Sequence, residues 1–116
     1  MGTVIQIFGT KKCRETAKAI RFFKERGVKI QFIDLAEKGP SKGELESIAC
    51  KIPIEELIDR EGKQYKQRQL EYKVFDIWEE LLSDPLLLRT PISRFGQEAQ
   101  LGVAPEVWKK WIEKAK

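Results

Sequence analysis

Histidine is absent from this chain of 116 residues, and cysteine occurs only twice, at Cys13 and Cys50. The missing histidines exclude Ser-His-Asp triads, cysteine proteases that need a histidine base, and nearly all zinc sites. Two cysteines are also too few for a disulfide framework. Any chemistry at a cysteine must therefore rely on local electrostatics or on an arginine or lysine partner.

Long apolar runs are absent as well. No stretch approaches the roughly 20 apolar residues of a membrane-spanning helix, and the first residues lack the basic-then-apolar layout of a signal peptide. We therefore expect a cytoplasmic protein that does not contact a membrane. The content of 41% hydrophobic and 34% charged residues is typical of a globular protein, and the length suits a single domain over residues 1–116.

The charge is slightly basic, with 22 lysines and arginines against 18 acidic residues and a net charge of +4. Such a balance would suit an anionic substrate or a nucleic acid. However, the two signs alternate closely, as in residues 24–26 and 59–61, which favours an ordinary solvated surface. The aromatic-basic signature of RNA-binding domains is missing, so we expect no direct contact with nucleic acid.

A β-α-β unit is predicted for the first third of the chain. Residues 3–8 are mostly apolar and β-branched, and residues 28–35 form a second strand. Between them, residues 13–26 carry apolar side chains at helical spacing, and Gly27 is suited to end that helix. Two strands joined by one helix in this way should run parallel.

Short helices are predicted for the middle of the chain. Ser41 and Glu44 have the spacing of a capping box that begins the first of them. Cys50 lies at the apolar end of this helix, beside Ile48, and is therefore expected to belong to the core. The predicted helices cover residues 42–50, 54–58, 65–70 and 76–82.

A β-β-α unit completes the chain. Strands are predicted over residues 86–93 and 100–103 with a turn at Gly96, and a final helix starts at Pro105. Pro91 lies inside the first of these strands, where a proline is out of place unless its peptide bond is cis or the strand is at an edge. The order of elements predicts an α/β domain with a mixed sheet.

Cys13 is the principal candidate for chemistry. It lies where the first strand gives way to a helix, and backbone N–H groups at a helix start favour the thiolate. Lys11, Lys12 and Arg14 add positive charge within two residues of the thiol. The alternative is a small buried hydrophobe next to ordinary solvated lysines. Its position and its neighbours favour a functional thiolate.

The order of elements, with a cysteine at the first helix start and a proline entering the third strand, resembles the thioredoxin fold. The helical segment between the two halves resembles the ArsC/Spx family, which covers glutaredoxin-dependent arsenate reductases, Spx regulators and uncharacterised relatives. This resemblance implies a mixed four-stranded sheet, with halves near residues 3–35 and 86–115 and a helical insert over 41–83. The supporting stretches are residues 7–13, 41–45, 57–60, 84–87, 90–92 and 101–103.

The resemblance also implies a site around Cys13. Pro91 would be the cis-proline that faces the thiol, and Thr90 would offer backbone groups to a bound thiol or peptide. The alternative is a plain edge-strand proline. Thr16 stands where dithiol members have the second cysteine of Cys-x-x-Cys, so the motif is monothiol. The candidates for binding an anion or substrate, besides Thr90 and Pro91, are Lys12, Arg14, Arg60 and Arg94.

Arsenate reductases of this kind hold the oxyanion with three arginines, and that set is incomplete here. Arg60 lies one residue from the place of the first, and Thr90 holds the place of the second. Arg89 precedes Thr90, so strand alternation should turn it away from the thiol, whereas Arg94 shares the nominal face of Thr90. The third arginine would fall near residues 102–103, where none occurs.

The resemblance implies a thiol oxidoreductase, arsenate reductase-like or glutaredoxin-like. Cys13 would attack a disulfide, a glutathione adduct or an oxyanion, and an external thiol such as glutathione or glutaredoxin would resolve the intermediate. We expect no bound cofactor or metal, a monomer, and a small thiol or thiol-disulfide protein as partner. The alternatives are an Spx-like regulator that binds RNA polymerase, for which Thr16 removes the Cys-x-x-Cys redox switch, and a catalytically inactive family member.

Overall fold

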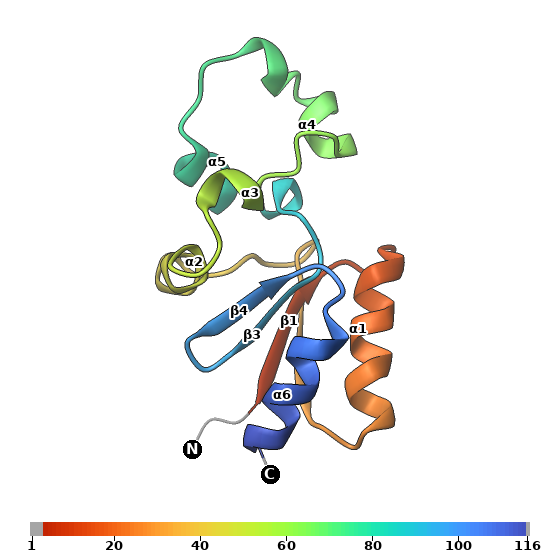
Figure 1. The fold of residues 1–116 in the computed structure, drawn as a ribbon. Coiled ribbons are helices and arrows are strands. Elements are labelled where there is room, and N and C mark those ends of the chain that lie inside the picture. Colours follow the sequence, from red (N-terminus) through yellow and green to blue (C-terminus); the bar gives the residue numbers. More distant parts are fainter. Residues whose placement is uncertain (1–3, 116) are drawn as a thin grey trace.

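A mixed sheet of four strands lies at the centre of the structure, a computed structural model that describes residues 4–115 (Figure 1). The strand order is β2-β1-β3-β4, in which β1 pairs parallel with β2 and the other two pairings are antiparallel. The predicted α/β fold with a mixed sheet is thus confirmed. The strands are β1 (Ile5–Gly9), β2 (Ile30–Asp34), β3 (Ile92–Phe95) and β4 (Glu98–Leu101).

Helices cover both faces of this sheet. α1 (Arg14–Glu25) and α6 (Pro105–Ala115) lie on one face, and α2 (Lys42–Ala49) lies on the other (Figure 1). Successive residues of a strand point to opposite faces. Ile7 accordingly packs with the buried tryptophans of α6, whereas its neighbour Phe8 packs in the core beneath α2.

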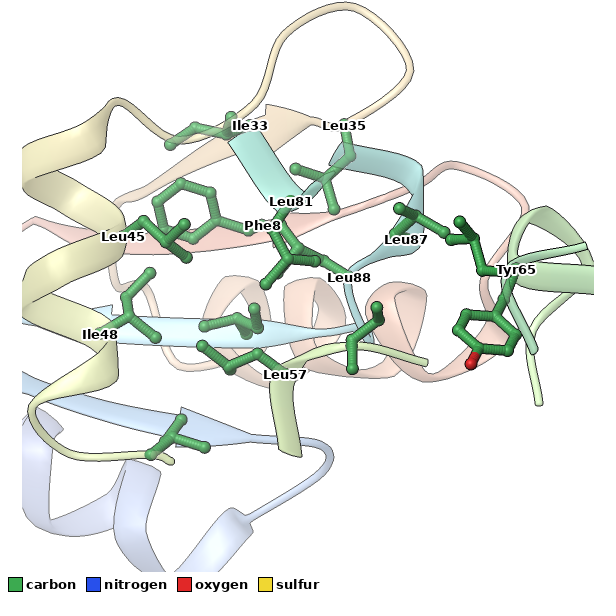
Figure 2. Close-up of a cluster of buried hydrophobic side chains, with 14 residues drawn as sticks. Phe8, Ile33, Leu35, Leu45, Ile48, Leu57, Tyr65, Leu81, Leu87 and Leu88 are labelled. Atoms are coloured by element: carbon green, nitrogen blue, oxygen red, sulfur yellow. The ribbon is translucent and has the colours of Figure 1, made fainter. Parts of the chain in front are cut away.

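The remaining helices form a short-helix insert beyond one end of the sheet (Figure 1). Buried leucines from this insert, including Leu57, Leu81 and Leu87, continue the core that begins at Phe8 (Figure 2). A bridge between Ile58 and Leu88 adds a backbone connection. The insert is therefore joined to the sheet by shared core. Its helices are α3 (Ile54–Leu57), α4 (Lys63–Gln67), η1 (Leu70–Tyr72), α5 (Ile77–Ser83) and η2 (Pro85–Leu87).

The predicted strand over residues 86–93 is wrong in its first half. Pro85 begins the 3₁₀ turn η2, and regular pairing starts only at Ile92, after a cis Thr90–Pro91 peptide bond. A proline lacks the N–H that a strand ladder requires, so pairing cannot extend smoothly through Pro91. The strand predicted over 100–103 also ends earlier, because Gly102 has a φ of +80°.

Cys50 is exposed, which corrects its expected place in the core. The buried face of α2 is formed by Leu45 and Ile48. Cys50 follows Ile48 by two residues, about 200° further round the helix, and therefore points away from that face. The first strand was predicted to start at Thr3, which lies outside the described residues. No helix within residues 4–115 has the length and apolar character needed to cross a membrane.

Candidate active site around Cys13

Cys13 lies where β1 turns into α1. It occupies the cap position before Arg14 with extended backbone angles, and its N–H donates to the Thr10 carbonyl over 3.2 Å. The preceding strand ends at Gly9, where a Cβ atom would clash with the Thr16 side chain. Glycine at this position therefore lets the first turn of α1 lie directly against the end of β1.

Thr90 brings the start of β3 to the thiol. Its hydroxyl Oγ1 donates to Cys13 Sγ over 3.1 Å, and the next peptide bond is the cis bond to the buried Pro91. The contact joins residues 77 positions apart in the sequence. The half-buried sulfur is thus held between the first turn of α1 and the segment that enters β3.

Hydrogen bonds favour the ionised form of this thiol. Burial raises the pKa of Cys13, but the hydroxyls of Thr16 and Thr90 and the backbone N–H groups of Thr16 and Glu15 together lower it below its ordinary value. Thr16 is 1% exposed, and its hydroxyl oxygen makes no well-formed hydrogen bond among residues 4–115. Its proton is therefore available to the sulfur.

The thiol opens into a cavity of about 520 Å³. A second cavity of about 580 Å³ adjoins it, and Asp59 and Thr90 line both. The thiol cavity has Leu101 and Gly102 on its β4 side, and its charged lining residues are Glu15, Asp59, Glu61 and Arg89. The second cavity is lined by the turn before Cys13, the end of β2 and the start of α4.

Comparison with known proteins supports the same fold. The model of the ArsC family matches residues 8–111. The chain belongs to the ArsC family. Its curated relatives include the uncharacterized protein YusI of Bacillus subtilis, which is 29% identical over 98 residues, with 78% of this chain and 83% of YusI covered.

Two solved structures resemble this ArsC-family chain over most of its length. A putative ArsC family related protein from Bacteroides fragilis has a TM-score of 0.81 at 18% identity, with 96% of this chain and 99% of that chain covered. An arsenate reductase from Vibrio cholerae has a TM-score of 0.76 at 19% identity, with 92% and 96% covered. Both support the thioredoxin-like fold of the ArsC-family chain.

The cations that were expected around the thiol of this ArsC-family chain lie in different places. Arg89 lines the thiol cavity, so the expectation that it points away is wrong. Residue 89 precedes the paired part of β3, and strand alternation does not apply there. Lys12 lines the adjoining cavity instead, and Arg14 is exposed on α1 and lines neither.

Arg60 and Arg94 lie elsewhere, which corrects their predicted place at an anion site beside Cys13. Arg60 donates to the Tyr65 hydroxyl over 3.1 Å within the insert. Arg94 lies beneath α2 and donates to Gln6 over 2.7 Å and to Ser47 over 3.3 Å. In each case a local polar partner holds the guanidinium away from the thiol.

The sequence-based prediction missed the three carboxylates of the thiol cavity, Glu15, Asp59 and Glu61. Glu15 is two residues after Cys13, so its proximity was available from the sequence. The other two come from the loop between α3 and α4, whose packing against the thiol depends on the tertiary fold. Among residues 4–115, no group of three or more acidic or cysteine side chains is arranged to hold a metal ion.

Proposed function

We propose that this ArsC-family protein is a monothiol oxidoreductase that exchanges disulfides through Cys13. The observation that carries this proposal is the geometry of the sulfur. It accepts a hydrogen bond from Thr90, lies at the start of α1 and opens into a cavity. Those features support a nucleophilic thiolate rather than an inert buried cysteine.

The exchange proceeds in two balanced steps. The Cys13 thiolate attacks one sulfur of the substrate disulfide, so that a bond forms to Cys13 Sγ and the substrate S–S bond breaks. The departing thiolate takes a proton from water. An external thiolate, from glutathione or a glutaredoxin, then attacks the mixed disulfide and releases Cys13. The external thiol is needed because position 16 carries a hydroxyl instead of a second thiol.

Disulfide exchange has better support than arsenate reduction. Of the arginines considered for an oxyanion site, only Arg89 lines the thiol cavity, and three carboxylates line it too. An arsenate ion in that cavity would face more negative than positive side chains. A disulfide needs no such cluster of cations, because the charge that develops on attack is shared between sulfurs.

The pH dependence of Cys13 alkylation tests the proposal. Iodoacetamide labelling is followed by mass spectrometry in a Cys50→Ser background, because Cys50 is exposed and would react as well. The rate should follow an apparent pKa below the ordinary cysteine value of about 8.5. A pKa at or above that value would contradict the proposal. With glutathione and glutaredoxin present, a mixed disulfide should turn over while arsenate yields no arsenite.

A second candidate is a binding module of the Spx type that contacts RNA polymerase. It is favoured by Tyr72, the last residue of η1, and by Val74, which precedes α5; these residues are 81% and 105% exposed. Exposed large apolar side chains placed together are common at protein interfaces. If this candidate holds, purified RNA polymerase should retain the parent and a Cys13→Ser variant but not a Tyr72→Ser/Val74→Ser variant.

A further inference from the structure

The walls of the thiol cavity carry more negative than positive charge. Glu15 comes from the first turn of α1, and Asp59 and Glu61 come from the loop between α3 and α4. Arg89 is the one cation among the charged residues that line this cavity within the described chain. Within residues 4–115 none of the four takes part in an ion pair.

The lysines before Cys13 line a different cavity. Lys11 and Lys12 line the adjoining cavity, together with Lys63, and neither lysine lines the cavity of the thiol. The two cavities therefore differ in charge although they share the walls formed by Asp59 and Thr90. The sulfur is open to the acidic one.

The negative charge of the reacting sulfur adds to the charge of these carboxylates. Attack requires the Cys13 thiolate, which the lowered pKa of this thiol favours. An anionic substrate must then approach a negative sulfur through a cavity lined with carboxylates. A substrate with an ammonium or guanidinium group close to its disulfide gains attraction from both.

We propose that this cavity selects disulfides that carry positive charge next to the sulfur under attack, and that it disfavours anionic disulfides and oxyanions. Leu86, which is 42% exposed, lines the adjoining cavity, and Val103, which is 40% exposed, follows Gly102 of the thiol cavity; both supply apolar surface. A peptide disulfide flanked by lysine or arginine fits this combination. The selectivity presupposes the thiol–disulfide exchange proposed above.

The exchange step has the same electron balance whether the substrate disulfide is cationic, neutral or anionic. With cystamine, the Cys13 thiolate forms a mixed disulfide with one cysteamine unit, the S–S bond breaks, and the second unit leaves as a thiolate that is protonated by water. A neutral thiol such as 2-mercaptoethanol then attacks the mixed disulfide as its thiolate, forms a disulfide with the bound unit and regenerates the Cys13 thiolate. One disulfide and one thiol are consumed, and one disulfide and one thiol are formed.

Three small disulfides of similar size test the selectivity. Cystamine carries two ammonium groups, bis(2-hydroxyethyl) disulfide is neutral, and 3,3′-dithiodipropionate carries two carboxylates. Mixed-disulfide formation at Cys13 is measured by mass spectrometry in the Cys50→Ser background at low salt. Each rate is divided by that of N-acetylcysteinamide, a free thiol. The corrected rate for cystamine should exceed that for dithiodipropionate by about tenfold, since each exposed or partly exposed carboxylate contributes a factor of about two to five.

Charge variants show whether the cavity walls cause the preference. Glu15→Gln/Glu61→Gln should bring the cystamine to dithiodipropionate ratio close to that of the free thiol, whereas Arg89→Gln should increase it. The matched control is Glu25→Gln/Glu113→Gln, which removes the same charge from residues that line neither cavity and should leave the ratio unchanged. Using the ratio within each variant cancels any change in the nucleophilicity of Cys13.

The outcomes separate this inference from the proposed function. Rapid exchange with all three disulfides at equal corrected rates, or a preference for dithiodipropionate, would overturn the selectivity and leave the exchange function standing. A ratio that falls equally in the matched control would assign the effect to net charge and also overturn it. Exchange no faster than that of the free thiol with any of the three would overturn both.

Discussion

The polar cluster beneath α2 and the cavity beside Cys13 contain similar charged side chains, but these side chains differ in the partners that they contact. Beneath α2, Gln6 links Arg94 to Glu44, and Arg94 also donates to Ser47. Beside Cys13, three carboxylates and Arg89 line a cavity, and none of them forms an ion pair within the described chain. The first arrangement links most of its charged groups by hydrogen bonds between side chains, although Arg94 Nε has no partner within the described chain. In the second, Asp59 accepts only from the Glu61 N–H of its own loop, and the charged side chains line a cavity that a substrate can enter.

The difference explains why one arginine holds the fold and another is available for binding. Arg94 lies on the face of β3 that α2 covers, so its guanidinium must find partners or remain unsatisfied. Burial raises the pKa of Glu44, but hydrogen bonds from Ser41 and Gln6 lower it below its ordinary value, and the charge of Arg94 adds a smaller lowering. Arg89 is exposed, so its guanidinium does not need hydrogen-bond partners within the protein.

Replacing the thiol should have the largest effect on the chemistry of the cavity beside Cys13. In the Cys50→Ser background, Cys13→Ser should abolish mixed-disulfide formation and turnover with glutathione, because a hydroxyl is not ionised near neutral pH. Cys50→Ser should retain both, since Cys50 is exposed at the end of α2 and lines neither cavity. Mass spectrometry of the protein after reaction with cystamine measures both variants. Equal loss in Cys50→Ser would contradict the assignment.

Arg94→Ala should reduce the free energy of unfolding by about 1–3 kcal/mol, because it leaves Gln6 and Ser47 beneath α2 without their partner. Arg89→Ala, the matched control from the thiol cavity, should change stability by less than about 0.5 kcal/mol. Urea denaturation followed by tryptophan fluorescence gives both values. The pKa of Cys13 should stay unchanged in Arg94→Ala, and a shift there would contradict a purely structural role.

Removing a hydroxyl from the thiol site should have a smaller effect. Thr90→Val deletes the hydrogen bond to the sulfur, so the Cys13 pKa should rise and alkylation near pH 7 should slow by about tenfold. Thr90→Ser should restore most of the rate. Ser83→Ala, which removes a hydroxyl from the end of α5, is the control and should have no effect. An unchanged pKa in Thr90→Val would show that the hydroxyl does not stabilise the thiolate.

The lowered pKa of Cys13 should also make stability depend on pH. Folding favours the thiolate, so this contribution is fully present above the pKa of the unfolded thiol, about 8.5, and is lost as the pH falls through the lower pKa of the folded state. Relative to Cys13→Ser, the parent should gain stability between pH 6 and pH 9. Urea denaturation across this range measures the difference, and the opposite slope would contradict a lowered pKa.

Local patterns were enough to predict the first half of the site. The end of β1 and the start of α1 follow from apolar spacing and from Gly9, so Cys13 could be placed at a helix start from the sequence. The order of elements, with the resemblance, also predicted the mixed sheet. Cys50 was misplaced because an apolar neighbourhood in the sequence was taken for an apolar helix face.

The other half of the site depends on contacts that the sequence does not encode locally. Asp59 and Glu61 line the thiol cavity only because the insert packs on the end of the sheet through Leu57 and Leu87. Arg89 was assigned to the wrong face because strand alternation was extended across the cis Thr90–Pro91 bond, before β3 begins.

The loop between α3 and α4 makes the thiol site modular. It supplies two of the three carboxylates in the thiol cavity, while the nucleophile and its threonine partner come from the thioredoxin-like halves. Ile58 in the same loop is fully buried and bridges Leu88, so the backbone of the loop is part of the fold. Exchanging only the side chains of Asp59 and Glu61 would therefore retune which disulfides the protein accepts without disturbing the sulfur that attacks them.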